Sequence, residues 1–90
     1  MNDYLKKAKN NFEQIRAHRR DFHKHAEIGF QETRTAGKIA EYLRSLNIEV
    51  QTGIAKTGVV GILRCGSGKT VALRADIDAL PVTEANNVPY

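Results

Sequence analysis

The stretch "ETRTAGKIAEYLRSLNIEV" (Glu32–Val50) joins a helical pattern directly to a strand pattern. Apolar side chains recur at steps of three and four over 32–46, which predicts an amphipathic helix with one buried face. The inward positions are Ala36, Ile39, Ala40, Leu43 and Leu46, and the outward positions are Arg34, Lys38, Glu41 and Arg44. Asn47 suits a left-handed C-terminal cap, and 48–50 ("IEV") then alternates as a short strand.

The N-terminal part of the chain has the same helical spacing. One stripe of side chains recurs at steps of three and four, which predicts a single helix from about Asn2 to His23. The stripe consists of Leu5, Ala8, Phe12, Ile15, Arg19 and Phe22. The following stretch, "KHAEIGFQE", has no period and contains Gly29, so we expect a loop between the two helices.

Two runs rich in β-branched residues follow, at 57–63 ("TGVVGIL") and 70–75 ("TVALRA"). The connection between them, "RCGSGK", is rich in Gly and Ser, which is typical of a hairpin loop. From Asp76 onward the chain loses periodicity. The order helix, helix, strand, strand, strand predicts an α/β fold, in which two N-terminal helices pack on a small sheet of about three strands.

The composition is that of one globular domain. The 90 residues include 41% apolar and 27% charged residues, and no internal repeat or linker divides 1–90. No apolar run approaches the ~18 residues of a membrane helix, and no apolar signal-peptide core is visible. Cys65 has no second cysteine with which to form an internal disulfide, which favours a reducing compartment. We therefore expect a cytoplasmic protein with no membrane partner.

The formal net charge is +4, and much of the excess lies in "IRAHRRDFHKH" (Ile15–His25). The basic side chains there are Arg16, Arg19, Arg20 and Lys24. Such a cluster can contact nucleic-acid phosphates, or it can form the solvated face of a helix. No aromatic stacking platform, helix-turn-helix or zinc-finger spacing accompanies it. We expect a solvated face and no nucleic-acid partner, with nucleic-acid binding as the weaker alternative.

The segment "GSGKT" (66–70) has part of a phosphate-binding loop. The full pattern, Gly-x-x-x-x-Gly-Lys-[Ser/Thr], needs a glycine at the position that Leu63 occupies, and it needs a helix after the loop. The sequence instead has a strand pattern after Thr70. We therefore interpret "GSGKT" as a turn.

The segment "HKHAE" places His23, His25 and Glu27 close together, with His18 further back on the helix. His-x-His can chelate a metal from an extended segment, because alternate residues share a face. Zinc takes three or four ligands, and the other soft donor, Cys65, lies in the expected turn. We therefore expect His23, His25 and Glu27 to have structural roles, with the histidines orienting a loop through hydrogen bonds.

Asp76 and Asp78 follow directly on the last strand pattern, in "VALRADIDALP" (71–81). Paired carboxylates at the carboxyl end of a strand can bind a divalent metal, orient a metal-ligating histidine, or act as acid and base. They can equally be solvated loop acids, with Arg74 as an ion partner. Spacing alone leaves both interpretations open. Two carboxylates without a further ligand do not complete a catalytic metal site.

The stretch from "RRDFHKHAEIGFQETRTAGKIAEYLRSLNIEV" through "TGVVGIL" to "VALRADIDALPVTE" resembles the opening of the M20 metallopeptidases. The closest branch is the amidohydrolases, which include N-acyl-amino-acid amidohydrolases, hippurate hydrolases and auxin-conjugate hydrolases. The resemblance covers the chain from about Leu5 to Tyr90. Its specific motifs are a His-x-His-Pro-Glu type segment (His23–Glu27) and Arg-Ala-Asp-x-Asp-Ala-Leu-Pro (Arg74–Pro81). The chain departs at Ala26, where the branch usually has proline.

The resemblance implies a two-domain enzyme whose α/β-sandwich catalytic domain carries a di-metal centre, usually zinc and sometimes manganese or nickel. A smaller lid domain helps to shape the substrate site. Asp78 matches an aspartate that orients a metal ligand, and Asp76 matches a position that is a ligating histidine in the wider family. In the amidohydrolase branch, ligands come from a Cys-Gly-His-Asp motif slightly downstream and from later Glu and His residues, with a neighbouring glutamate as general base.

On this resemblance, 1–90 is the N-terminal segment of the catalytic domain, without the metal ligands, the base or the lid domain. We expect the intact enzyme to hydrolyse N-acyl amino acids or small peptide-like substrates, and this chain alone to be inactive and to bind no metal. Asp78 is expected to support the site and Asp76 to line it. Uncovered apolar sheet surface predicts self-association. The alternative is a non-catalytic remnant or oligomerising module.

Overall fold

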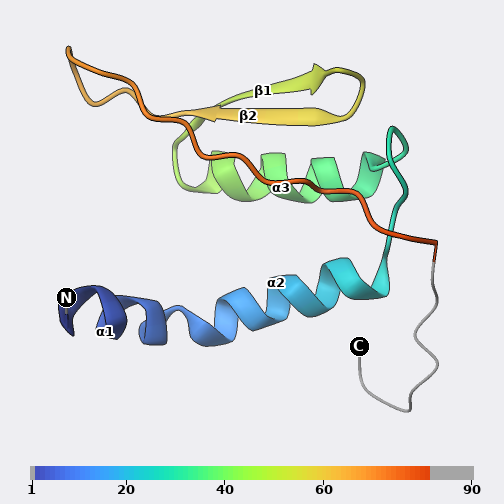
Figure 1. The fold of residues 1–90 in the computed structure, drawn as a ribbon, viewed down its shortest axis with the longest axis horizontal. Coiled ribbons are helices and arrows are strands. Elements are labelled where there is room, and N and C mark those ends of the chain that lie inside the picture. The colour runs from blue at the N-terminus through green and yellow to red at the C-terminus, as the bar shows by residue number, and fades with distance from the viewer. Residues whose placement is uncertain (1, 82–90) are drawn as a thin grey trace. The chain divides into compact units, whose positions relative to one another are not determined.

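The computed structural model describes residues 2–81, in which three helices and one two-stranded antiparallel sheet form (Figure 1). These residues divide into two compact units, 2–26 and 27–81. The first unit contains helices α1 (Asn2–Asn10) and α2 (Phe12–Lys24). The second contains helix α3 (Thr33–Ser45) and strands β1 (Glu49–Ile54) and β2 (Gly58–Ile62). The α/β class predicted from the sequence is confirmed.

The predicted single N-terminal helix is two helices, separated at Asn11. The Asn11 N–H is shared between the carbonyls of Lys7 (3.3 Å) and Ala8 (3.2 Å), while its own carbonyl accepts the Ile15 N–H at 3.0 Å. The hydrogen-bond ladder therefore tightens for one turn and then resumes. Two consecutive asparagines, which have low helix propensity, lie at the break, and the Asn11 side chain makes no capping hydrogen bond there.

Helix α3 ends as the sequence predicts. Asn47 adopts a left-handed conformation (φ 60°), and its N–H donates to Arg44 O at 3.0 Å. The Ile48 N–H donates to Leu43 O at 3.1 Å. These two bonds form a Schellman motif, which satisfies carbonyls that the end of a helix leaves open and turns the chain into β1.

Helix α3 packs along the β1–β2 hairpin, and this contact forms the core of the second unit (Figure 1). Ala40 and Thr35, both on α3, are 3% and 5% exposed. Gly61 on β2 permits the close approach, because a Cβ there would lie 3.1 Å from a Leu43 methyl and 3.2 Å from an Ile48 methyl. The absence of a side chain at Gly61 therefore lets helix and strand meet.

The hairpin differs from the predicted one in its position. β1 pairs with β2 through a turn at 55–57, with Glu49 opposite Ile62 and a register shift between Thr52 and Ile54. The predicted third strand, 70–75, is not formed, and Val71 and Leu73 are 86% and 98% exposed. An apolar run becomes a strand only when its backbone finds a ladder partner, and β2 pairs with β1 alone among the described residues.

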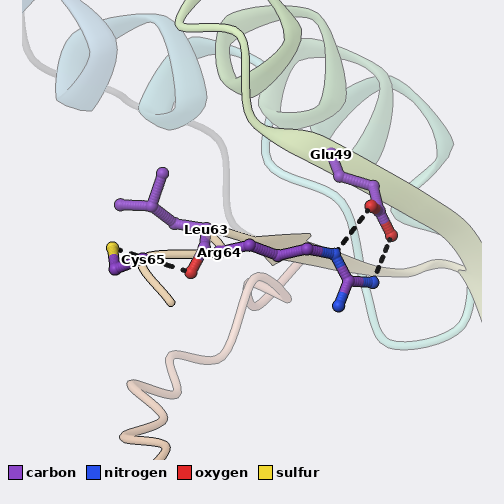
Figure 2. A network of polar contacts seen from close by, with 4 residues as sticks. All are labelled: Glu49, Leu63, Arg64 and Cys65. Carbon is purple, nitrogen blue, oxygen red and sulfur yellow. Dashed lines mark hydrogen bonds and ion pairs between the residues drawn. The ribbon is translucent and has the colours of Figure 1, made fainter. Parts of the chain in front are cut away.

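The open end of the hairpin carries an exposed ion pair (Figure 2). Arg64 Nε and Nη2 donate to the two carboxylate oxygens of Glu49 at 3.3 and 3.4 Å. Away from this ion pair, the Cys65 thiol lies 4.0 Å from Leu63 O. Because both charged side chains are solvated, the pair contributes at most about 1 kcal/mol to stability.

A buried carboxylate ties the hairpin turn to the start of α3. Glu32 is 7% exposed, and Thr57 Oγ1 donates to its Oε1 at 3.1 Å. We expect Thr57→Val to lower the free energy of unfolding by about 1–3 kcal/mol, because it removes a donor from a buried charged acceptor. Thr57→Ser, which keeps the hydroxyl, and Thr52→Val, at an exposed site on β1, serve as controls in urea denaturation. Equal effects of Thr57→Val and Thr52→Val would contradict the assignment.

Candidate functional site

The loop before α3 is held by the side chain of Glu27. Its carboxylate accepts the backbone N–H of Arg34 at 3.1 Å and that of Thr35 at 2.6 Å. These amides belong to the first turn of α3, whose N–H groups have no partners within the helix. The residue at the N-cap position, Glu32, makes no capping hydrogen bond with its side chain. Glu27 therefore caps α3 from outside the helix.

The electrostatic surroundings of Glu27 favour its ionised form. Partial burial raises the pKa of this carboxyl, but the Thr35 side chain, the Thr35 and Arg34 amides and the Arg34 charge outweigh that effect. The net result is a pKa below the ordinary glutamate value. Hydrogen bonds to the charged form and a nearby guanidinium both act in this direction.

The lowered pKa makes the contribution of Glu27 to stability depend on pH. The contribution is fully present above the unfolded pKa, ~4.3, and is lost as the pH falls through the lower folded pKa. We expect the difference in unfolding free energy between the chain and Glu27→Gln to be constant from about pH 7 to about pH 5 and to shrink below about pH 4. Denaturant unfolding at stepped pH measures it. A difference that grows as the pH falls would contradict the contact.

The segment that carries Asp78 returns to this same loop. The Ala79 N–H donates to Glu27 O at 2.7 Å. Asp78 Oδ2 lies 3.8 Å from the position that a Cβ on Gly29 would take. Ile77 and Ala79 are half-buried while Asp78 is exposed, so the segment presents the Asp78 carboxylate to solvent beside the loop.

The loop itself holds an unusual backbone conformation. Phe30 has φ 64°, in the left-handed region, and the Gln31 N–H closes a turn onto Ile28 O at 3.0 Å. Lys56, in the hairpin turn, also has a positive φ (80°), and its ammonium lies 5.5 Å from the centre of the Phe30 ring. This cation–π contact links the loop to the hairpin.

Asp76 has a different environment from Asp78. Its Oδ1 lies 3.1 Å from Arg74 Nη2, and the two side chains are 70% and 87% exposed. A pair this solvated is weak, so it leaves the Asp76 carboxylate available to other partners. Asp76 therefore has Arg74 as its ion partner, as expected if it is a solvated loop acid. Asp78 lies apart from this pair, beside the loop at Gly29.

The histidines of the "HKHAE" segment lie in the first unit. His25 Nδ1 lies 2.9 Å from Asp21 O and 3.6 Å from Asp21 Oδ1, and the His25 N–H donates to Phe22 O at 3.2 Å. His25 therefore closes the last turn of α2. The rings of His18 and Phe22 stack with centroids 6.5 Å apart on the same helix. His23 is exposed near the end of α2.

The donors described do not assemble into a metal site. Within residues 2–81, no three His, Cys, Asp or Glu side chains gather closely enough to hold an ion. Asp76 and Asp78 can contribute only part of a ligand set. No helix follows "GSGKT" in these residues, as a phosphate-binding loop would require. None of the helices described has the length and apolar character of a membrane span.

Comparison with known proteins identifies relatives over most of the chain. A hippurate hydrolase of Campylobacter jejuni is 48% identical over 80 residues, which is 88% of this chain and 20% of the relative. YhaA of Bacillus subtilis, named an amidohydrolase, is 44% identical over 80 residues (88% and 20%). An uncharacterized hydrolase of Staphylococcus aureus is 43% identical over 81 residues (90% and 21%). The names and coverage of these relatives fit the predicted resemblance to the N-terminal segment of an amidohydrolase.

The chain spans about a fifth of the length of the curated relatives it matches. No family model and no solved structure matches it. The sequence indicated Glu27 as structural but not the contacts it makes, because a cap that acts from seven and eight residues away lies outside the usual capping patterns. The Thr57–Glu32 bond has no sequence signal either.

Proposed function

We propose that this chain is the N-terminal part of a metal-dependent amidohydrolase that hydrolyses the amide bond of N-acyl amino acids or small peptide-like substrates. The observation that carries the proposal is the 48% identity with a hippurate hydrolase over 80 residues. The names of the other two relatives, an amidohydrolase and a hydrolase, support the same reaction class. The 90 residues alone have no turnover under this proposal.

Within the proposed enzyme, Asp78 supports the catalytic site and Asp76 lines it. The exposed position of Asp78 beside the Glu27–Gly29 loop supports this role, since the carboxylate is accessible and held near a structured loop. A divalent metal, zinc or else manganese or nickel, is part of the proposal. The described residues do not make up the ligand set of this metal, so we derive no reaction step through it.

A cytoplasmic location is also part of the proposal. The free thiol of Cys65, the one cysteine of the sequence, supports it, because cysteines stay reduced in the cytoplasm.

The proposal is tested by a chimera, in which the matching segment of the C. jejuni hippurate hydrolase is replaced by this chain. We expect the chimera to hydrolyse hippurate and the isolated 90-residue chain to give no turnover with zinc, manganese or nickel. Metal analysis of both proteins accompanies the assay. Stoichiometric zinc and turnover in the isolated chain would overturn the proposed inactivity.

A second candidate function is a non-catalytic module that associates with itself. Exposed apolar side chains favour it: Leu63, Val71 and Leu73 are 70%, 86% and 98% exposed. Surface of this kind marks interaction sites or aggregation. Sedimentation of the purified chain tests self-association, and a monomer at all concentrations would exclude it.

We propose no nucleic-acid partner. A change in the electrophoretic mobility of duplex DNA when the chain is added at low ionic strength, reversed by added salt, would contradict this.

A further inference from the structure

We propose that Glu27 is a positioning residue for Asp78, a role that rests on the proposed function of the Asp76–Asp78 segment. Glu27 contacts two parts of the second unit at once. Its carboxylate binds the first turn of α3 through Arg34 and Thr35, and its carbonyl binds the Ala79 N–H. The residue next to Asp78 is therefore tied to α3 through Glu27.

The two contacts of Glu27 depend on each other. The carboxylate bonds, at 3.1 and 2.6 Å, fix the Glu27 backbone against a rigid helix. The carbonyl then has a defined place at which to accept the Ala79 N–H, at 2.7 Å. Without the side chain, Glu27 belongs to a loop with no anchor at its carboxylate. A site is positioned best when its supporting residues are themselves held on regular elements.

Two further observations limit where Asp78 can lie. The Asp78 carboxylate lies against the loop, since its Oδ2 is 3.8 Å from the place of a Cβ on Gly29, an ordinary van der Waals distance. The turn at Phe30 is braced from the hairpin by the Lys56 ammonium. Asp78 itself has no regular element of its own, since 70–80 forms no strand. Its placement therefore relies on Glu27.

The test is amide hydrogen exchange by NMR on the 90-residue chain and on Glu27→Ala. We expect the Arg34, Thr35 and Ala79 amides to exchange roughly 5- to 30-fold faster in the variant, the effect of losing one helix cap. The Ile48 amide, which bonds to Leu43 O at the other end of α3, serves as internal control and stays unchanged. Glu27→Gln keeps one acceptor oxygen and restores part of the protection.

Two results of the exchange experiment would count against the proposal. If Thr35 accelerates and Ala79 does not, the cap exists but does not hold Asp78. If Ile48 accelerates as much as Ala79, the effect is general loss of the fold. These readouts do not involve hydrolysis, so an inactive chimera would count against the proposed function and leave the role of Glu27 standing.

A titration gives the same answer if Glu27→Ala does not fold. The titration uses the Asp78→Asn variant, so that the Asp78 carboxylate does not contribute to the signal. We expect the amide chemical shifts of Thr35 and Ala79 to change with the same midpoint pH, because both report the protonation of Glu27. The charged group facing the Glu27 carboxylate is Arg34, which does not titrate in this range. An Ala79 shift that does not follow the Thr35 midpoint would overturn the coupling.

Discussion

Asp78→Asn in the chimera is expected to lower kcat for hippurate roughly 10- to 100-fold, with a smaller change in KM. The substitution keeps the size of the side chain and removes its charge. A carboxylate that orients a catalytic group acts mainly on the reacting complex and not on substrate binding. Its exposed position beside the Glu27–Gly29 loop means that the substitution should leave the fold intact. Initial rates over a range of hippurate concentrations separate the two parameters.

Two matched substitutions control for a general loss of charge. Glu41→Gln changes an exposed carboxylate on α3 and should leave both parameters unchanged. Asp76→Asn, at a carboxylate paired with Arg74, should have a smaller effect than Asp78→Asn. If Asp78→Asn retains the rate of the unsubstituted chimera, Asp78 has no role in the site.

Gly58→Ala is expected to lower the free energy of unfolding of the chain by about 1–3 kcal/mol. A Cβ at Gly58 would lie 2.5 Å from Ile54 O, and this oxygen belongs to the backbone of the paired strand. The clash cannot be relieved by rotating a side chain, so the end of the hairpin must move. In a chain of this size such a loss is a large part of the total stability.

Gly37→Ala is the matched control for this prediction. Gly37 lies inside α3 with nothing within 4 Å of a Cβ placed there, so alanine should stabilise the helix by about 0.5–1 kcal/mol. Urea denaturation of both variants measures the two effects together. Equal effects of the two substitutions would contradict the tight contact at Gly58.

Helix α3 could be predicted from sequence because its period, its cap and the following strand agree. The expected range 32–46 differs by one residue at each end from Thr33–Ser45, and Asn47 takes the predicted left-handed conformation. The N-terminal stripe predicted helix over nearly the same residues but not the break at Asn11. The spacing of apolar residues shows which face of a helix is buried, but it does not show where one turn tightens and interrupts the helix.

The hairpin could not be placed from sequence because its turn has no turn signature. Ala55 and Lys56 have φ values of 49° and 80°, which most L-residues avoid. The glycines that suggested a turn, Gly66 and Gly68, do have positive φ, but they lead into 70–75, which has no strand partner. Turn chemistry predicts where the chain can bend, and strand pairing is decided by contacts distant in sequence.

The candidate site was partly predictable for a related reason. The motifs indicated Asp76, Asp78 and the "HKHAE" segment. They did not indicate that the Asp78 segment returns to Glu27, because the Ala79–Glu27 bond joins two stretches with no shared period. The same limit applies to the bond between Thr57 and Glu32.

Hippurate hydrolysis by the chimera tests the central claim most directly. If this chain is the N-terminal part of an amidohydrolase, the chimera folds, binds metal and hydrolyses hippurate, and a chelator abolishes its activity. The isolated 90-residue chain, assayed in parallel, gives no turnover. A chimera that folds and binds zinc, manganese or nickel, yet fails to hydrolyse hippurate, would contradict the account.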